Sequence, residues 1–178
     1  MSTEEVQGLI GEMMFLKDSL IPKYGELKAI QSWTHPVKGK QDFMIDDTWY
    51  EVKTIKSGSN VVEITSLEQL DSEKVGSLNV IVVKSSTIEA NGAYNIKKIH
   101  SEIASSLTDP AAKDLFVDKT IDDDIDNDSY NSIIFEKEDD RTYVVTGDFP
   151  RLTPNNVSAA ISKASYGINL GLIEKYKV

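Results

Sequence analysis

Apolar residues recur at helical spacing along the N-terminal part of the chain. Ser2 and Glu5 form the capping-box pattern S-x-x-E, which marks the start of a helix. A set of apolar positions then falls on one helical face: Val6, Leu9, Ile10, Met13, Leu20 and Ile21. Phe15 projects nearly opposite that face, so the pattern predicts a helix that packs on two sides. Pro22 and Gly25 close the segment.

The chain then shows the patterns of a β-hairpin and of two further strands. KQDFMIDDTWYEVKT (40–54) has the pattern of two short strands joined by a tight turn at residues 46–48. VVEIT (61–65) has the pattern of a strand. LNVIVVKSS (78–86) is a mostly continuous apolar run, which is typical of a strand buried on both faces.

Two helical segments separate and follow these strands. SLEQLDSE (66–73) predicts a helical turn capped by Ser66. NIKKIHSEIASSL (95–107) is amphipathic and predicts a helix. Helices interleaved with strands in this order indicate an α/β fold with a central mixed sheet flanked by helices.

The last third of the chain has a different pattern. DKTIDDDIDNDSYN (118–131) is acidic and rich in turn-forming residues, which predicts a linker. SIIFEKEDDRTYVVTG (132–147) predicts a β-hairpin with its turn near residues 138–141. The segment 149–178 begins with a proline-marked turn and is predicted to end in a short strand.

The length and composition fit one ordinary domain. With 178 residues, 40% of them hydrophobic, the chain is long enough to bury a core. We expect a single domain over 1–178, with a core over about 1–108 and a C-terminal elaboration over about 109–178. Neither a membrane-spanning apolar run nor a signal-peptide pattern is present, and cysteine is absent, so we expect a cytoplasmic protein without membrane contact.

The net charge of −10 constrains the partners. A protein that coats nucleic acid by bulk electrostatics needs cationic contacts to phosphates, and this chain has an excess of carboxylates. An enzyme that meets nucleic acid through one local patch and a bound cation remains compatible with this charge.

The sequence contains two weaker candidate sites, an acidic segment and two histidines, and for both an ordinary structural role is favoured. The acidic segment matches an EF-hand loop at its first three ligand positions, but Ser129 stands in place of the turn glycine and Phe135 in place of the bidentate glutamate. A solvated acidic loop is therefore favoured over a calcium site. His35 and His100 are isolated and lack the spacing of metal ligands, so zinc chemistry and a Ser-His-Asp triad have little support.

The hairpin supplies a stronger candidate. Glu51 and Lys53 share one face of a strand, while Val52 points to the other. The preceding turn folds Asp42 back alongside Glu51, and Glu12 on the first helix offers a third carboxylate. Two readings stay open at this point: a solvated polar edge, or paired carboxylates that hold Mg²⁺ beside a lysine. Apolar neighbours on both faces indicate a central strand, where unpaired charges are costly.

These residues resemble the PD-(D/E)XK phosphodiesterase superfamily, which includes many restriction endonucleases. The chain is also similar, through nearly its whole length, to a bacterial family of PD-(D/E)XK motif proteins whose genes tend to lie beside restriction–modification and phage-defence genes. The segments that carry the likeness are GLIGEMMFL (8–16), QDFMIDDTWYEVKT (41–54), VVEITSLEQLD (61–71) and DFPRL (148–152). The resemblance implies a restriction-endonuclease-like fold.

The resemblance also implies a role for each matching residue. Asp42 and Glu51 would be the metal-binding carboxylates, with the Val52 carbonyl completing the coordination. Lys53 would be the catalytic lysine, and Glu12 would correspond to the helix glutamate at or near the metal.

Gln69 would match a glutamine that orients the substrate or the lysine, on the helix after the core strands. Gln41 stands where the nominal proline of the motif would be. A local basic cluster surrounds the site, comprising Lys38, Lys40, Lys53 and Lys56.

The expected function is therefore that of a Mg²⁺-dependent deoxyribonuclease of the restriction or phage-defence type, with Mn²⁺ as a substitute metal and DNA as the partner. We expect a homodimer or association with other subunits of such a system. The alternatives are a catalytically inactive member that serves as a structural or binding subunit, and an acidic mimic of DNA. Members of the family usually carry an extra segment ahead of the glutamate helix, so we expect a natural short form, a dissected domain or one subunit of an assembly.

Overall fold

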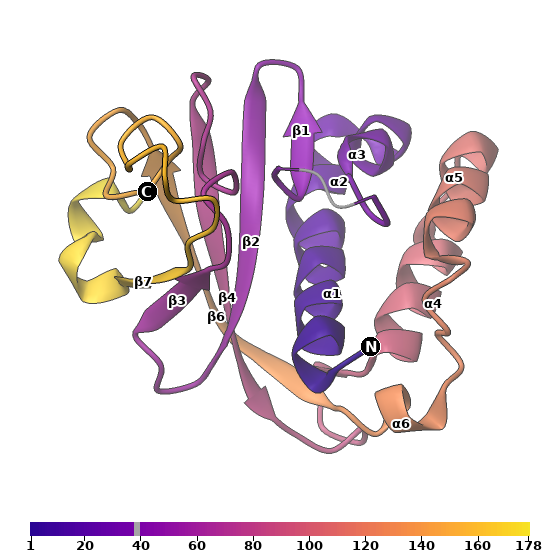
Figure 1. Ribbon diagram of the computed structural model, residues 1–178. Coiled ribbons are helices and arrows are strands. Elements are labelled where there is room, and N and C mark those ends of the chain that lie inside the picture. Colours follow the sequence, from indigo (N-terminus) through magenta and orange to yellow (C-terminus); the bar gives the residue numbers. More distant parts are fainter. Residues whose placement is uncertain (38–39) are drawn as a thin grey trace.

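A mixed β-sheet of five strands runs through the middle of the molecule (Figure 1). The computed structural model of the protein describes residues 1–37 and 40–178. The strand order is β1-β2-β4-β6-β5, with β2 parallel to β4 and the other neighbours antiparallel. The strands of this sheet are β1 (Phe43–Ile45), β2 (Thr48–Lys56), β4 (Gly76–Ser85), β5 (Ala93–Tyr94) and β6 (Phe135–Val145).

The α-helices cover one face of this sheet (Figure 1). They are α1 (Thr3–Phe15), α2 (Ile21–Tyr24), α3 (Glu26–Ser32), α4 (Ile96–Ser106), α5 (Pro110–Thr120) and α6 (Asp128–Asn131). A π-helical stretch, Leu16–Leu20, joins α1 to α2. Within the described ranges, no helix has the length and apolar character needed to cross a bilayer.

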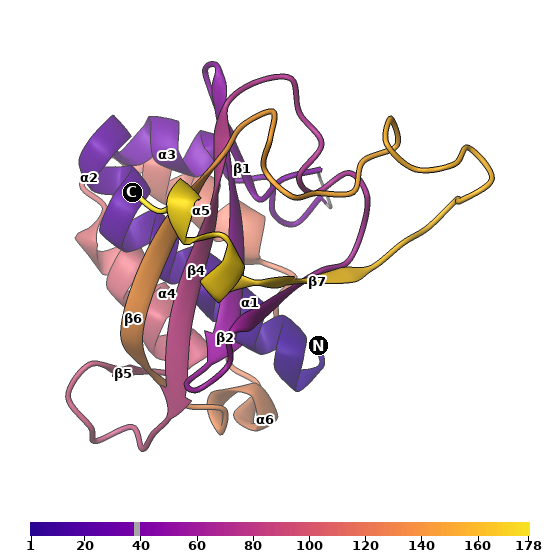
Figure 2. The same ribbon diagram turned by 90° about the vertical axis from the view of Figure 1, so that its left-hand side faces the viewer.

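The opposite face of the sheet is covered by a second, two-stranded sheet and the C-terminal segment (Figures 1 and 2). This sheet pairs β3 (Val61–Ile64) with β7 (Tyr166–Asn169), and two short 3₁₀ helices follow, Leu170–Leu172 and Glu174–Tyr176. Each face has its own hydrophobic cluster, the helical side around Ile10 and Phe116 and the other side around Trp49 and Ile168. The central strands are therefore buried on both faces, which confirms an α/β architecture with a mixed sheet.

The N-terminal helix begins as its sequence predicts. Ser2 caps α1, and its side chain and that of Glu5 form both reciprocal hydrogen bonds of the capping box. The helical run ends at Gly25, whose φ of +83° lies in the region that favours glycine. Phe15 packs in the core against Phe43 and Tyr50, with ring centroids 5.7 and 5.5 Å apart. The helix thus packs on two sides, and Phe15 finds its partners within this chain.

The predicted hairpin is also confirmed. β1 and β2 pair antiparallel, with Met44 opposite Trp49. Asp46 has a φ of +51° in the turn, which aspartate tolerates better than most residues. Asp46 and Asp47 are exposed and pair with lysines from neighbouring segments, so they act as turn residues.

The predicted hairpin over 132–147 is wrong. Residues 135–145 form one continuous strand, β6, which pairs with β4 from Gly76 opposite Val145 to Ser85 opposite Phe135. The register shifts between Val82 and Val83, so the charged stretch thought to be a turn contains a β-bulge instead. Its polar side chains are exposed while the backbone continues the ladder, and β6 lies inside the sheet between β4 and β5.

Two other local predictions need correction. Residues 66–73 form bends and turns and not a helix. The linker predicted over 118–131 overlaps two helices, because α5 extends to Thr120 and Asn127 caps the short α6. The short strand predicted in 149–178 is present as β7, although 3₁₀ turns follow it to the C-terminus.

Helix α1 approaches strand β2 closely at Gly11. A Cβ atom at this position would lie 1.9 Å from Thr54 Oγ1 and 3.2 Å from Thr54 Cβ. Nearby, the Gln7 side-chain amide donates a hydrogen bond of 2.9 Å to the Thr54 carbonyl. The absence of a side chain at Gly11 therefore sets the distance between α1 and β2, and with it the position of the adjacent Glu12.

This close approach predicts that Gly11→Ala destabilises the protein. Because the added methyl group overlaps Thr54, we expect a loss of about 1–3 kcal/mol in the free energy of unfolding, measured by urea denaturation. Gly8→Ala is the matched control on the same helix, since nothing lies within 4 Å of its Cβ position. That variant should gain up to about 1 kcal/mol from helix propensity. Equal effects of the two substitutions would contradict the packing described for Gly11.

Candidate functional site

The carboxylate of Asp42 lies where the β1–β2 pairing ends. β1 begins at Phe43, opposite Tyr50, so the next residue outward, Asp42, falls beside Glu51. Asp42 Oδ2 accepts a hydrogen bond of 2.7 Å from the Val52 backbone N–H. The side chain therefore continues the hydrogen bonding of the hairpin beyond its last strand residue, and it fixes one carboxylate at the edge of β2.

Glu51 is almost completely buried in β2, with 1% of its surface exposed. Lys53 follows on the same face of the strand, and its Nζ lies 2.8 Å from Glu51 Oε1. This contact is an ion pair whose geometry is not that of a directed hydrogen bond, and no described residue donates a hydrogen bond to either carboxylate oxygen. Glu51 is thus a buried acid that forms an ion pair with Lys53.

Burial dominates the electrostatics of Glu51. Loss of solvent raises its pKa to about 8, against an ordinary value of 4.5. The Lys53 ammonium opposes this rise, whereas the negative charge of Asp42 adds to it. Burial also raises the pKa of Asp42, although the Val52 N–H and Lys53 act in the other direction. The two carboxylates are therefore close enough to repel each other.

Glu12 joins the same cluster from α1. Its Oε2 accepts a hydrogen bond of 2.7 Å from the indole N–H of Trp33. Burial raises the Glu12 pKa well above its ordinary value, and the charges of Asp42 and Glu51 raise it further. The structure thus brings together four of the predicted site residues, Glu12, Asp42, Glu51 and Lys53, from one helix and one hairpin. Among residues 1–37 and 40–178, no group of three or more His, Cys, Asp and Glu side chains has the arrangement of a metal site.

Comparison with known proteins identifies the family. Residues 1–171 match the model of the family described as "Putative PD-(D/E)XK family member, (DUF4420)". The chain belongs to this family. No curated protein and no solved structure matches the chain. In this DUF4420 chain, Asp42, Glu51 and Lys53 remain the residues predicted to carry the pattern for which the superfamily is named.

Gln69 does not lie as the resemblance implies. The helix expected to carry it is absent, and its Oε1 accepts hydrogen bonds from the Thr65 backbone N–H at 2.8 Å and the Thr65 hydroxyl at 3.2 Å. Ser66 likewise accepts only a local contact, from the Glu68 backbone N–H. The Gln69 side-chain oxygen thus stabilises the local turn through Thr65. The role of Gln69 stays a prediction.

Two supporting residues were missed from the sequence. Gln41, only 3% exposed, donates from its side-chain amide to the carbonyl oxygens of Glu68, Gln69 and Asp71, at 3.0, 3.4 and 3.3 Å. Trp33 is equally buried, and it orients Glu12. A buried indole N–H needs a hydrogen-bond acceptor, so a contact between Trp33 and a nearby carboxylate could have been predicted from the sequence. Nothing local in the sequence indicated where Gln41 would point.

The remaining candidate residues are the lysines of the predicted basic cluster, the two histidines and the acidic segment. Lys40 and Lys56 are exposed, whereas Lys38 lies outside the described residues. His35 Nε2 lies 2.8 Å from an Asp123 carboxylate oxygen and its ring stacks on Trp33. His100 hydrogen-bonds Thr120 and stacks on Phe116, and burial lowers its pKa. In the acidic segment, the carboxylate of Asp126 pairs with Lys97.

The raised pKa of Glu51 predicts how the stability of this DUF4420 protein depends on pH without metal. The folded state holds the proton up to about pH 8, whereas the unfolded chain releases it near its ordinary pKa of 4.5. The folded state therefore binds more protons between these values, so its free energy of unfolding falls as the pH rises through this window. The loss should be on the order of 5 kcal/mol.

Urea denaturation in EDTA at several pH values from about 5 to about 9 measures this slope. Glu51→Gln should reduce the slope, because the amide does not titrate while Glu12 and Asp42 still do. Glu89→Gln, at an exposed loop position, is the matched control and should leave the slope unchanged. A wild-type stability that rises across the window would show that Glu51 is not buried in this way.

Proposed function

We propose that this protein is a metal-dependent phosphodiesterase that cleaves DNA, an endonuclease of the restriction or phage-defence type with a restriction-endonuclease-like fold. One observation carries the proposal: the Glu51 carboxylate is buried beside that of Asp42, and among the described residues its ion-pair partner is Lys53. Such an arrangement is costly for a purely structural role, because buried like charges repel unless a cation lies near them. Membership of a PD-(D/E)XK family supports the same chemistry.

The donor atoms suit a hard divalent cation. Asp42 and Glu51 offer carboxylate oxygens, and the Val52 carbonyl belongs to the residue whose N–H binds Asp42. Oxygen ligands of this kind fit Mg²⁺, with Mn²⁺ as a substitute. The buried carboxylate oxygens of Glu51 accept no hydrogen bond from the described residues. Glu12 offers a further carboxylate close to those of Asp42 and Glu51. When bound, the cation supplies Lewis-acid polarisation of the phosphodiester and activation of water.

The residues of the chain itself have separate tasks in this proposal. Asp42 and Glu51 bind the metal as carboxylates, so Glu51 must lose its proton on loading. The Lys53 ammonium orients the attacking water and stabilises the charge that develops on the phosphate. Glu12, oriented by Trp33, supports the metal ligands. The Gln69 amide donates to the substrate or to groups around Lys53.

The proposed substrate is DNA met through a local surface. The net charge of −10 opposes general binding to phosphates, so contacts must be concentrated at the site. Lys40 and Lys56 are exposed and flank the hairpin, and a bound cation offsets part of the local carboxylate charge. Association as a homodimer, or with other subunits of a defence system, would add further contacts to the DNA.

Cleavage of a plasmid by the pure protein tests the proposal. Supercoiled DNA should be nicked or linearised with Mg²⁺ or Mn²⁺ and left intact in EDTA. Lys53→Ala should reduce the rate about a hundredfold or more, because it removes the ammonium group that lies beside the carboxylates. Asp42→Asn and Glu51→Gln should abolish metal-dependent cleavage.

Lys113→Ala is the matched control, since this exposed lysine lies on α5 and outside the site. It should cleave like the wild type. Two outcomes would contradict the proposal: no cleavage with either metal under any condition of salt and pH that keeps the protein folded, or full activity in Lys53→Ala. The first outcome would favour an inactive member of the family that serves as a binding subunit.

A further inference from the structure

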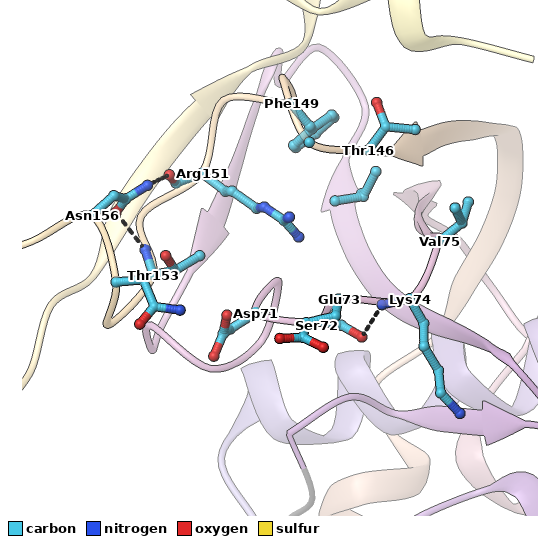
Figure 3. Close-up of a pocket in the computed structure, with 13 residues that line it drawn as sticks. Asp71, Ser72, Glu73, Lys74, Val75, Thr146, Phe149, Arg151, Thr153 and Asn156 are labelled. Atoms are coloured by element: carbon cyan, nitrogen blue, oxygen red, sulfur yellow. Dashed lines mark hydrogen bonds between the residues drawn. The ribbon is translucent and has the colours of Figure 1, made fainter.

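A cavity of about 440 Å³ opens between two loops, residues 71–75 and 145–156 (Figure 3). Its volume falls in the range of small-molecule sites, about 300–1,000 Å³. The second loop is held in shape by Asn156, which donates to the Arg151 carbonyl and accepts from the Thr153 N–H, both at 2.8 Å. Thr153 is itself buried. The loop that forms this wall of the cavity is therefore stabilised by its own hydrogen bonds.

Arg151 reaches from this wall into the middle of the cavity, above Asp71 (Figure 3). It is one of only two arginines in the sequence. The other, Arg141, pairs with Asp139 at 2.8 Å. In the described part of the chain Arg151 has no carboxylate partner, and its guanidinium donates to the Leu70 carbonyl. That contact uses one donor and leaves the rest of the fork directed at the cavity.

The charges around Arg151 disfavour an anion as the ligand. Asp71 and Glu73 line the cavity with it. Lys74 also belongs to the lining, but its ammonium turns away and pairs with Asp47 at 3.0 Å (Figure 3). One guanidinium opposed by two carboxylates suits an uncharged group that has both acceptors and donors. A nucleobase has this chemistry, and a phosphate does not.

The cavity is joined to the candidate catalytic site through four consecutive peptide carbonyls. Gln41, the neighbour of Asp42, donates to the carbonyls of Glu68, Gln69 and Asp71. Arg151 donates to the carbonyl between them, that of Leu70. The segment 68–71 is thus held by one side chain from the catalytic hairpin and by another from the cavity. The cavity wall and the Gln41–Asp42 end of the hairpin are therefore tied to the same short segment.

We propose that this cavity binds an unstacked base of the DNA strand that passes the catalytic site, with guanine preferred. Arginine pairs with the O6 and N7 acceptors of guanine through two parallel hydrogen bonds, and the carboxylates accept from the donors of the base. The base must leave the stack to enter the cavity, which costs least in single-stranded DNA. This inference rests on the proposed function, because it takes DNA as the substrate.

Binding to short single strands in EDTA tests the inference without cleavage. The probes are fluorescent oligothymidine 11-mers with a central dT, dG, dA or dC, followed by anisotropy. The dG probe should bind about 5- to 150-fold more tightly than the all-dT probe, the range typical of one bidentate contact. Arg151→Ala should abolish this preference, and Arg141→Ala should retain it. Equal binding of the four probes, or a preference that survives Arg151→Ala, would overturn the inference.

A second variant separates recognition from folding. Arg151→Lys keeps a positive charge and a donor for the Leu70 carbonyl, but it lacks the planar fork. The melting temperature of this variant should equal that of the wild type, and the variant should still lose most of the dG preference. Retention of the full preference in this folded variant would also overturn the inference. Because every measurement is made without metal, failure to find cleavage and failure to find base preference are independent results.

Discussion

The arrangement of this molecule depends on one costly feature, the burial of the Glu51 carboxylate beside that of Asp42. The strand β2 carries Glu51 between the helical layer and the β3–β7 layer, so water is largely excluded from it. Lys53 offsets part of the charge, and the pKa of Glu51 rises to about 8. Burial destabilises an ionised Glu51, and a bound cation would offset this cost because its positive charge compensates for the loss of solvent around the carboxylate oxygens.

The other parts of the site hold these acids in place. Gly11 lets α1 approach Thr54, which places Glu12 where Trp33 can donate to it. Gln41 binds the segment 68–71 from the side of the β1–β2 hairpin, and Arg151 binds it from the cavity side. These hydrogen bonds link parts of the chain far apart in sequence. The catalytic proposal and the cavity proposal thus share one supporting framework while they depend on different side chains.

The sequence predicted the elements whose signals are local. The capping box, the β1–β2 hairpin and the buried strand β4 each follow from spacing within a few residues, and so does the placement of Asp42 near Glu51. The strand β6 was mistaken for a hairpin because its exposed charged residues resemble a turn, whereas the ladder to β4 keeps the backbone extended. The helix α5 was missed although Asp109 and Pro110 form a recognisable start. The contacts of Gln41 arise only from tertiary packing.

The central claim is that Asp42, Glu51 and the Val52 carbonyl bind one divalent cation. Crystals of the protein grown with Mn²⁺ would test it directly, by anomalous scattering from the metal. The account predicts a peak within bonding distance of both carboxylates and of the Val52 oxygen, at about 2.0–2.3 Å. A fully ordered site with no anomalous peak at saturating Mn²⁺, or with the two carboxylates turned away from a common point, would contradict it.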